Sequence, residues 1–377
     1  MKTLTAEIKK LAAGQGFHQT GITHVGSLAE GEKAILDWTS QDKHGTMKYL
    51  EDFGRRRRRF FEDMPDASSV LVLGLNYYDF RGEKKPAGPV PGKIARYAWG
   101  KDYHEIIRAK HLRLIEGIQK SAGPSFKAKS CVDIQPLPEK FAARQAGFGF
   151  IGKNTLLLSK EYGPWLFLSE IVTNLDLQED LPAQGNCGTC KSCQTVCPTG
   201  ALDQDYKIDA RLCIAYLTIE HKGIIPRELR PKIKDWVFGC DECLDICPFT
   251  SKSQQTDCED LTSSSGFGPS LDLETLFNIR SNSDYEKLFA GTAVLRASRK
   301  QLLRNACVVL GNSGKEEALP LLEKALNDPA WLVRLHAAWG LAQFKGPLVM
   351  EILRERLRKE SEPAVAEELK WALNSLP

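Results

Sequence analysis

Cysteines in two short runs are the residues whose spacing points most directly to chemistry. The first run has the C-x2-C-x2-C-x3-C-P spacing that holds cubane iron–sulfur clusters, and it reads Cys187-Gly-Thr-Cys190-Lys-Ser-Cys193-Gln-Thr-Val-Cys197-Pro198. The second run keeps that spacing but has Val237 in place of its first cysteine, and it reads Cys240-Asp-Glu-Cys243-Leu-Asp-Ile-Cys247-Pro248. Cys213 lies between the runs and can supply the missing ligand.

The cysteine before proline in such a run ligates the other cluster of the pair. We therefore predict two [4Fe–4S] clusters, one held by Cys187, Cys190, Cys193 and Cys247, and one held by Cys197, Cys213, Cys240 and Cys243. A disulfide framework fits poorly with a chain that lacks a signal peptide, and zinc sites need no cysteine-proline crossover between runs. Clusters of this kind transfer single electrons. Cys131, Cys258 and Cys307 fall outside the pattern and are expected to be small buried or neutral residues.

Length and composition indicate an ordinary folded chain of two or three domains. The chain has 377 residues, of which 42% are hydrophobic and 26% charged. An amphipathic segment that ends near Gly14 follows Met1, and no apolar run is long enough for export or for spanning a membrane. We therefore expect a cytoplasmic protein without a membrane partner. The net charge is only +3 (51 basic minus 48 acidic residues), so any nucleic-acid surface must be a local patch.

Residues 1–180 are predicted to form one mixed α/β domain. The apolar run at 70–75 predicts a strand that is covered on both faces, and residues 165–172 predict a second strand. Between them, apolar residues recur at helical spacing over 103–120, and Gly123-Pro124 ends that helix. The cluster module follows at 181–255.

Two stretches of this domain have residue types that suit a ligand. Five consecutive arginines occupy Arg55–Arg59; most are expected to be solvated, although one could clamp an anion. The stretch 94–104 is dense in aromatic and donor groups. It would suit a large, flat ligand that carries amides, but a packed loop would have a similar composition.

A third stretch combines a carboxyl with a glycine-rich loop. Asp133 follows a predicted strand end at 128–132, and a carboxyl shielded from water there would keep its proton near neutral pH and could act as a general acid; it could equally be a satisfied cap. Farther on, glycines at 147, 149 and 152 allow close approach of a ligand, and Lys153, Asn154 and Thr155 can donate to it. These glycines match G-x-G-x-x-G by letter, but no βαβ context follows, so a nucleotide site is not predicted.

The tail at 256–377 is predicted to be a short helical-repeat array. Asn305-Ala306 with Leu310 recurs as His336-Ala337 with Leu341 after 31 residues, and Trp339 with Leu341 recurs as Trp371 with Leu373 after 32. Periods of this length are typical of paired-helix solenoids, here HEAT-like. Between 291 and 305 the basic residues have no acidic neighbours, which favours a phosphate-facing surface over a solvated helix face; they are Arg296, Arg299, Lys300 and Arg304, and Arg334 could extend the surface.

In combination, these motifs resemble the epoxyqueuosine reductases. The Asp133 segment, the Gly-Phe-Ile-Gly-Lys-Asn-Thr stretch at 149–155, the paired cysteine runs and the repetitive tail occur in that family's order over essentially the whole chain. The resemblance implies an α+β multidomain fold, with a nitroreductase-like α/β domain that binds cobalamin, a ferredoxin-like module with two clusters, and HEAT-like repeats. It also implies reduction of the epoxide of epoxyqueuosine at the wobble position of tRNA, the last step of queuosine biosynthesis.

The resemblance also implies roles for single residues. Asp133 matches the family's proton donor, and the expected cobalamin contacts are Arg57, Tyr97, Asp133, Lys153, Asn154 and Ser169. None of the seven histidines lies in an Asp-x-His-x-x-Gly motif, so we expect no histidine from that motif beneath the cobalt. The anticodon stem-loop of tRNA would dock on the basic tail. The chain is expected to be a monomer that takes electrons from a donor that the sequence does not identify.

Two other classes of protein share part of this pattern. A reductive dehalogenase-like enzyme that acts on a small molecule would share the clusters and cobalamin, but it would have no use for a basic helical tail. An electron-transfer subunit would need only residues 187–247, and would leave the glycine-rich loop unexplained. Cobalamin binding separates the second class from the others.

Overall fold

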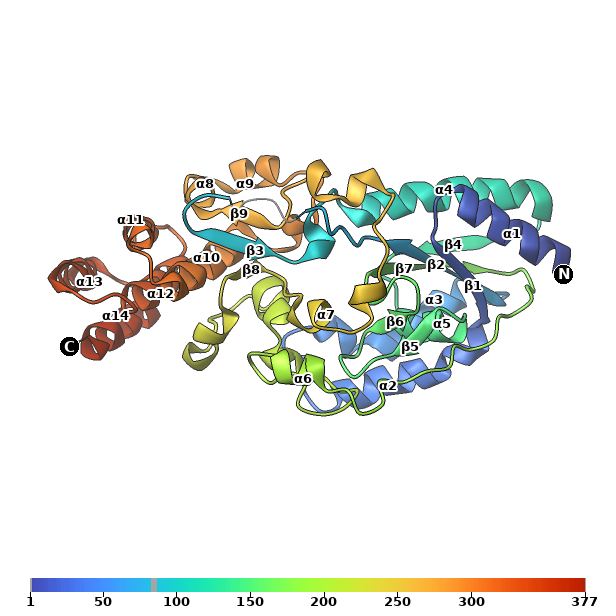
Figure 1. Cartoon of the computed structure of the whole chain (residues 1–377), viewed down its shortest axis with the longest axis horizontal. Helices are drawn as coiled ribbons and strands as arrows, with labels where there is room; N and C mark the ends of the chain where they lie inside the picture. The colour runs from blue at the N-terminus through green and yellow to red at the C-terminus, as the bar shows by residue number, and fades with distance from the viewer. Residues whose placement is uncertain (1, 83–86, 377) are drawn as a thin grey trace. The chain divides into compact units, whose positions relative to one another are not determined.

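The computed structural model describes residues 2–82 and 87–376, which fold into two compact units (Figure 1). The first unit consists of Met1–Phe80, Lys101–Arg211 and Glu242–Thr262, and the second of Arg81–Gly100, Leu212–Asp241 and Ser263–Pro377. The predicted boundaries at 180 and 255 separate sequence motifs, whereas packing joins residues 81–100 and 212–241 to the tail. Among the described residues, no helix combines the length and apolarity needed to cross a bilayer.

A four-stranded antiparallel sheet forms the centre of the first unit. Its strands lie in the order β1 (Gln19–His24), β2 (Ser69–Asn76), β7 (Leu166–Thr173) and β4 (Ala128–Cys131). Every residue of β2 is buried, as the continuous apolar run predicts for a strand covered on both faces. The strands predicted at 70–75 and 165–172 are therefore confirmed.

Successive residues of a strand point to opposite sides of the sheet, and β2 is buried along its whole length. Both faces of this sheet are therefore covered by helices. On one face lies α4 (Tyr103–Ala122), which packs on β4, β7 and α1 (Lys2–Gly14). On the other lies α5 (Glu139–Gln145), whose Ala142 and Ala143 join a core with Val70 and Val172. The remaining elements of this unit are α2 (Ala29–Thr39), α3 (Phe53–Glu62), and the hairpin of β5 (Gly149–Ile151) and β6 (Leu157–Ser159).

Two short helices carry the cysteine runs of the first unit. Helix α6 (Ser192–Val196) lies in the first run and α7 (Glu242–Asp245) in the second, and the two pack against each other although they are far apart in the sequence. Each helix ends just before a Cys-Pro pair, where proline would disfavour further helix.

The second unit joins a small sheet to a row of helices. The sheet has the order β8 (Trp236–Phe238), β3 (Pro91–Ile94) and β9 (Ser270–Asp272), with β3 parallel to β8 and antiparallel to β9. Helices follow as α8 (Leu273–Phe277), α9 (Asn282–Leu288), α10 (Arg299–Ser313), α11 (Leu319–Ala325), α12 (Trp331–Leu341), α13 (Pro347–Lys359) and α14 (Pro363–Ser375).

The predicted repeat corresponds to α10, α12 and α14, which pack in succession. Helix α10 begins with a capping box of Ser298 and Gln301 and ends at Gly314, which has φ of 63°. Helices α10 and α12 approach closely at a pair of glycines, because a Cβ atom on Gly311 would lie 2.8 Å from the Cα of Gly340. Paired helices with this period confirm the helical-repeat prediction.

Candidate functional site

The thiols predicted to hold one cluster lie together in the first unit. Cys187, Cys190, Cys193 and Cys247 are all partly exposed and free of disulfides. Burial, together with repulsion from the nearby thiolates of Cys187, Cys247 and Cys190, raises the pKa of Cys193. Of the thiols predicted to hold the second cluster, Cys197 and Cys243 belong to the first unit, and Cys213 and Cys240 belong to the second. Within the described residues, no His, Cys, Asp or Glu side chains group tightly enough for a single metal ion.

Asp133 lies just beyond the end of strand β4, in the loop that leads to α5. Its backbone has a φ of 63°, in the left-handed region, and its amide donates a 3.0 Å hydrogen bond to Glu139 Oε1. The side chain of Asp133 is about half exposed (49%), so the described residues do not provide the shielding from water that was given as a condition for a general acid, and its role as proton donor stays a prediction. Asp133 is thus a carboxyl that its own loop presents to a ligand.

His104 lies beside Asp133 and joins it to Asp102. The imidazole Nε2 is 3.3 Å from Asp133 Oδ2, and Nδ1 is 2.8 Å from Asp102 Oδ1. Asp102 also caps α4 by accepting a hydrogen bond from the His104 amide. Burial lowers the pKa of His104, but the hydrogen bonds to Asp102 and Asp133 outweigh it and raise that pKa to about 9. At neutral pH, therefore, His104 is a cation between two carboxylates.

Two further carboxyls interact with Asp133, the partly buried Glu139 and the fully buried Glu170. Burial, and next the charge of Asp133, raise the pKa of Glu139 to about 8. Glu170 on β7 is fully buried, and neither of its carboxyl oxygens has a hydrogen-bond partner in the part of the chain that the structure describes. Burial raises the pKa of Glu170 well above its usual value, followed by repulsion from Glu139 and Asp133. Both carboxyls therefore hold protons near neutral pH.

The arginine run forms helix α3, and two of its members have structural partners. Arg57 is buried, donates to Glu32 Oε2 at 2.9 Å and stacks on Phe61. Arg56 donates to the carbonyl of Ile134 at 2.7 Å, next to Asp133. The structure therefore places Arg56 at the Asp133 loop, whereas the residue predicted to contact cofactor was Arg57.

Lys153 and Asn154 lie close to a cluster ligand. The amide of Lys153 donates to Cys187 Sγ at 3.4 Å, and its buried ammonium pairs with Asp205 at 3.1 Å. Asn154 is buried as well; its Oδ1 accepts from the Leu156 amide, while Nδ2 has no partner among the described residues. The Asn154 side chain thus has a donor left for a ligand, and the Lys153 ammonium is already paired.

The last two predicted cofactor contacts, Ser169 and Tyr97, contact other side chains of the protein. Ser169 is fully buried on β7, and its hydroxyl is 3.0 Å from Nε2 of His111, whose pKa burial lowers to about 4. Tyr97 belongs to the second unit, in the turn Arg96–Ala98, where its ring packs on Phe238. The hydroxyl of Ser169 is already paired with neutral His111 inside the core, which disfavours the predicted role of Ser169 in a ligand pocket.

The arginines predicted to face phosphate on the tail are mostly inside the second unit. Arg304 is fully buried and donates to the carbonyls of Leu217, His221 and Gly223 at 2.6–2.8 Å. Arg299, 9% exposed, pairs with Asp328 at 2.6 Å. Each guanidinium is already satisfied by protein, which disfavours the predicted phosphate contact for both arginines.

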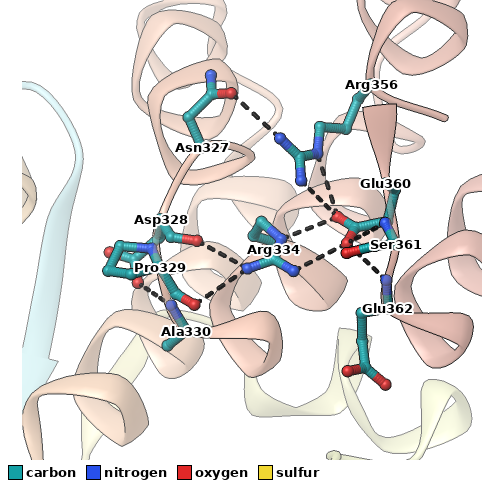
Figure 2. Close-up of polar contacts among 9 residues, drawn as sticks. All are labelled: Asn327, Asp328, Pro329, Ala330, Arg334, Arg356, Glu360, Ser361 and Glu362. Atoms are coloured by element: carbon teal, nitrogen blue, oxygen red, sulfur yellow. Dashed lines mark hydrogen bonds and ion pairs between the residues drawn. The ribbon is translucent and has the colours of Figure 1, made fainter. Parts of the chain in front are cut away.

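Arg334 is also used to hold the repeats together (Figure 2). It pairs with Glu360 at 2.8 Å and donates to the carbonyls of Asp328 and Pro329. Arg356 pairs with the other oxygen of Glu360, whose side chain is fully buried. Burial raises the pKa of Glu360, but the hydrogen bonds from Arg334, the Glu362 amide and Arg356 lower it to about 2. These contacts disfavour Arg334 as a phosphate contact.

Two of the five predicted tail residues keep exposed cationic groups. Arg296 is 49% exposed and pairs with Glu220 at 2.9 Å, and Lys300 is exposed near the start of α10. A phosphate could compete with the exposed Glu220 pair at little cost, since surface ion pairs contribute about 0–1 kcal/mol. Arg296 and Lys300 thus stay predictions as phosphate contacts.

Comparison with models of known protein families finds matches in three segments of the chain. The family described as epoxyqueuosine reductase QueG, DUF1730, matches residues 57–134. A 4Fe-4S double cluster binding domain matches residues 186–250, and HEAT repeats match residues 291–374. The cysteine spacing and the helical period therefore identified both modules correctly.

Curated relatives and solved structures match along nearly the whole chain. The epoxyqueuosine reductase of Xanthomonas campestris pv. campestris is 38% identical over 349 residues, which are 90% of this chain and 95% of that protein. The enzyme of Escherichia coli K12 is 35% identical over 351 residues, 91% and 90% of the two chains. A crystal structure of selenomethionine-labelled epoxyqueuosine reductase superposes with a TM-score of 0.89 at 27% identity, covering 100% of this chain and 99% of that one.

A further solved structure is epoxyqueuosine reductase with an epoxyqueuosine-modified tRNA stem loop. It has a TM-score of 0.88 and 27% identity, and the match covers 99% of this chain and 98% of that chain. The mixed sheet, the double-cluster segment and the repeats define an iron–sulfur oxidoreductase with a helical-repeat tail. Within that class, the chain belongs to the epoxyqueuosine reductase family.

Proposed function

We propose that this chain reduces the epoxide of epoxyqueuosine at the wobble position of tRNA and so forms queuosine. Family membership over the full length supports this reaction. The observation that carries the proposal is the contact between Asp133 and the protonated imidazole of His104, on a loop whose backbone is held by Glu139. Reduction of the epoxide to an alkene takes two electrons and two protons and releases the oxygen as water, and this pair holds one of the two protons at neutral pH.

The residues present fit the two kinds of cofactor that the family implies. The Cys187, Cys190, Cys193 and Cys247 thiols are a donor set for one [4Fe–4S] cluster, and Cys197, Cys213, Cys240 and Cys243 for the other. Asn154 lies in the sequence next to Lys153, whose amide contacts Cys187 of the first donor set. The buried Nδ2 of Asn154 has no partner among the described residues and could donate a hydrogen bond to an amide carbonyl of cobalamin. When bound, the clusters and cobalamin supply the electrons for reduction of the carbon–oxygen bond.

The residues of the chain bind the substrate, orient it and move its proton. The Asp133 carboxyl takes the proton from His104 and gives it to the epoxide oxygen, so the carboxyl acts as the acid and the imidazole as its source. Asp102 holds the His104 ring from the opposite nitrogen. Exposed Lys300 and Arg296 are proposed to contact phosphates of the anticodon stem-loop.

The test is anaerobic incubation of the cluster-replete chain with epoxyqueuosine-containing tRNA and a strong reductant, with and without cobalamin. Mass analysis of the nucleosides is expected to show loss of one oxygen from the modified base only when cobalamin is present. No conversion by protein that demonstrably holds both clusters and cobalamin would contradict the proposed reaction. The tRNA of a strain that forms no epoxyqueuosine is the control for substrate dependence.

The proposed proton source predicts a pH dependence of kcat/KM. Because the folded-state pKa of His104 lies above the ordinary 6.5, the imidazole keeps its proton until the pH rises through about 9. Burial opposes this shift, and the groups that raise the pKa of His104 are Asp102 and Asp133, which both hydrogen-bond to the imidazole. We therefore expect kcat/KM to be level near pH 7–8 and to fall above about pH 9.

The variant His104→Gln tests whether the fall of kcat/KM above about pH 9 comes from His104 or from another titrating group. The amide can still hydrogen-bond to Asp102 or Asp133 but cannot carry a proton, so kcat/KM should drop and the limb near pH 9 should vanish. The measurement is a pH profile of both proteins with cluster content verified at each pH. An identical alkaline limb in the variant would rule out His104 as its origin.

A further inference from the structure

Three buried polar side chains at the start of α10 donate hydrogen bonds to backbone carbonyls. They are Gln301, Arg304 and Asn305, all less than 4% exposed. Gln301 donates to the carbonyl of Ile219, and Arg304 to those of Leu217, His221 and Gly223. Burial lowers the pKa of Arg304 to about 9, yet α10 keeps an arginine at a position where an apolar side chain would need no partners. The acceptors all belong to the segment that follows Cys213.

Asn305 ties that segment to the one that precedes Cys240. Its Nδ2 donates to the carbonyl of Thr218 at 2.8 Å and to that of Val237 at 2.9 Å. Its Oδ1 accepts from Arg304 Nε at 3.0 Å and from Nη2 at 2.8 Å, which fixes the orientation of the amide. A single side chain of α10 thus sets the separation of two chain segments that are 19 positions apart in the sequence.

Thr218 completes the connection to the two cysteines. Its hydroxyl accepts from the amide of Gly239 at 3.0 Å and donates to the carbonyl of Ile214 at 2.8 Å. Gly239 directly precedes Cys240, and Ile214 directly follows Cys213. The Leu217 amide also donates to the Cys213 carbonyl at 2.9 Å. Because Ile214, Leu217, Thr218 and Gly239 are buried, moving one cysteine segment would leave several unpaired polar groups.

We propose that Arg304 and Asn305, acting through Thr218, position Cys213 and Cys240 as ligands of one [4Fe–4S] cluster. The first helix of the repeat array is then part of the support of a redox centre, in addition to any contact with RNA. The proposal rests on the cysteine assignment made under the proposed function. Ligand orientation and hydrogen bonding around the cysteines set the potential of such a cluster, so the network should affect that cluster and spare the one on Cys187, Cys190, Cys193 and Cys247.

Thr218→Val and Thr218→Ser form the sharpest pair of variants. Valine keeps the shape of the side chain but cannot accept from the Gly239 amide, whereas serine keeps the hydroxyl. We expect the midpoint potential and the electron paramagnetic resonance signal of one cluster to shift in Thr218→Val, and both clusters to be near wild type in Thr218→Ser. The measurement is an anaerobic redox titration of the full-length, cluster-replete proteins.

Arg304→Met and Arg299→Met form a second pair with a larger expected effect. Both arginines are buried on α10, but the partners of Arg299 are the Ile279 carbonyl and Asp328, which lie away from the cysteine segments in the sequence. Arg304→Met should reduce bound iron from about eight to about four atoms per chain, while Arg299→Met keeps about eight. Equal loss in both variants, or unchanged potentials and iron in Arg304→Met and Thr218→Val, would overturn the proposal.

Cys213→Ser distinguishes this failure from failure of the cysteine assignment. Cys213→Ser could lose one cluster while Arg304→Met keeps its iron and Thr218→Val keeps its midpoint potentials. That result would support Cys213 as a ligand and refute only the positioning role of Arg304, Asn305 and Thr218. Retention of both clusters in Cys213→Ser would refute the assignment, and the positioning role with it. Selective damage to the same cluster in Cys213→Ser, Arg304→Met and Thr218→Val would support both.

Discussion

Asp133→Asn is expected to lower turnover of epoxyqueuosine-containing tRNA by about 10²–10⁴-fold, the usual contribution of a positioned acid. Asparagine has nearly the shape of aspartate and can still hydrogen-bond to His104, but it cannot accept its proton and pass it on. Iron content should match that of the wild type because none of the proposed cluster ligands is changed, and cobalamin should still bind because asparagine keeps nearly the shape of Asp133 and can still hydrogen-bond. The measurement is single-turnover conversion under anaerobic conditions.

The asparagine variant isolates the carboxyl from the geometry of the loop. The left-handed backbone at 133 is one that aspartate and asparagine tolerate better than most residues, and the amide that donates to Glu139 is retained. Asp66→Asn is a matched control, since this carboxyl of the same unit is 40% exposed and pairs with Lys127. Wild-type turnover in Asp133→Asn would mean that His104 delivers its proton to the substrate without the carboxyl.

The cluster ligands and the repeats could be predicted because their signals are local. A cubane needs thiolates at fixed short spacings, and stacked helix pairs need their small and apolar residues at a fixed period. The matches at 186–250 and 291–374 confirm the double-cluster module and the repeats, whereas the role of each cysteine as a ligand stays a prediction. The strands at 70–75 and 165–172 were equally readable, since a central strand must be apolar on both faces.

The fate of the tail arginines could not be read from the charge pattern. Arg304 lies among basic residues like a phosphate contact, but its acceptors are carbonyls more than 80 positions earlier in the chain, and backbone carbonyls leave no signal in the sequence. One signal was available for the arginine run. Arg57 lies four residues from both Phe53 and Phe61, and this spacing places it on the buried face of α3.

Around Asp133, the sequence indicated one carboxyl, whereas the structure contains several interacting groups. Glu170 interrupts the apolar strand β7, and a carboxyl in such a strand is a signal that could have been followed. His104 was part of a stretch singled out for its donors, but its contact with Asp133 depends on how the start of α4 meets the end of β4. That contact joins residues 29 positions apart and is a property of the fold.

Glu368→Gln is expected to destabilise the second unit by about 3–5 kcal/mol, the cost of removing one partner of a buried ion pair. Glu368 on α14 is 3% exposed and accepts from Arg230 Nη1 at 2.7 Å and from Arg227 Nε at 3.0 Å. Arg230 is itself 1% exposed, so the variant would leave its charge buried without a counter-ion. Hydrogen exchange of α14 and of residues 227–233 measures this local opening free energy.

Glu367→Gln is the matched control, because Glu367 is the exposed neighbour on the same helix and should change exchange by less than about 0.5 kcal/mol. Equal protection in the two variants would show that Arg230 finds another partner.

The expected difference has a consequence for function. Arg230 lies between Cys213 and Cys240 in the sequence, so removing the tail would take away both α10 and the counter-ion of Arg230. A truncated chain would then lose turnover of any substrate, including small molecules, because the cluster segment would be damaged. The RNA-binding role of the repeats must therefore be tested with point variants of the exposed residues Lys300 and Arg296.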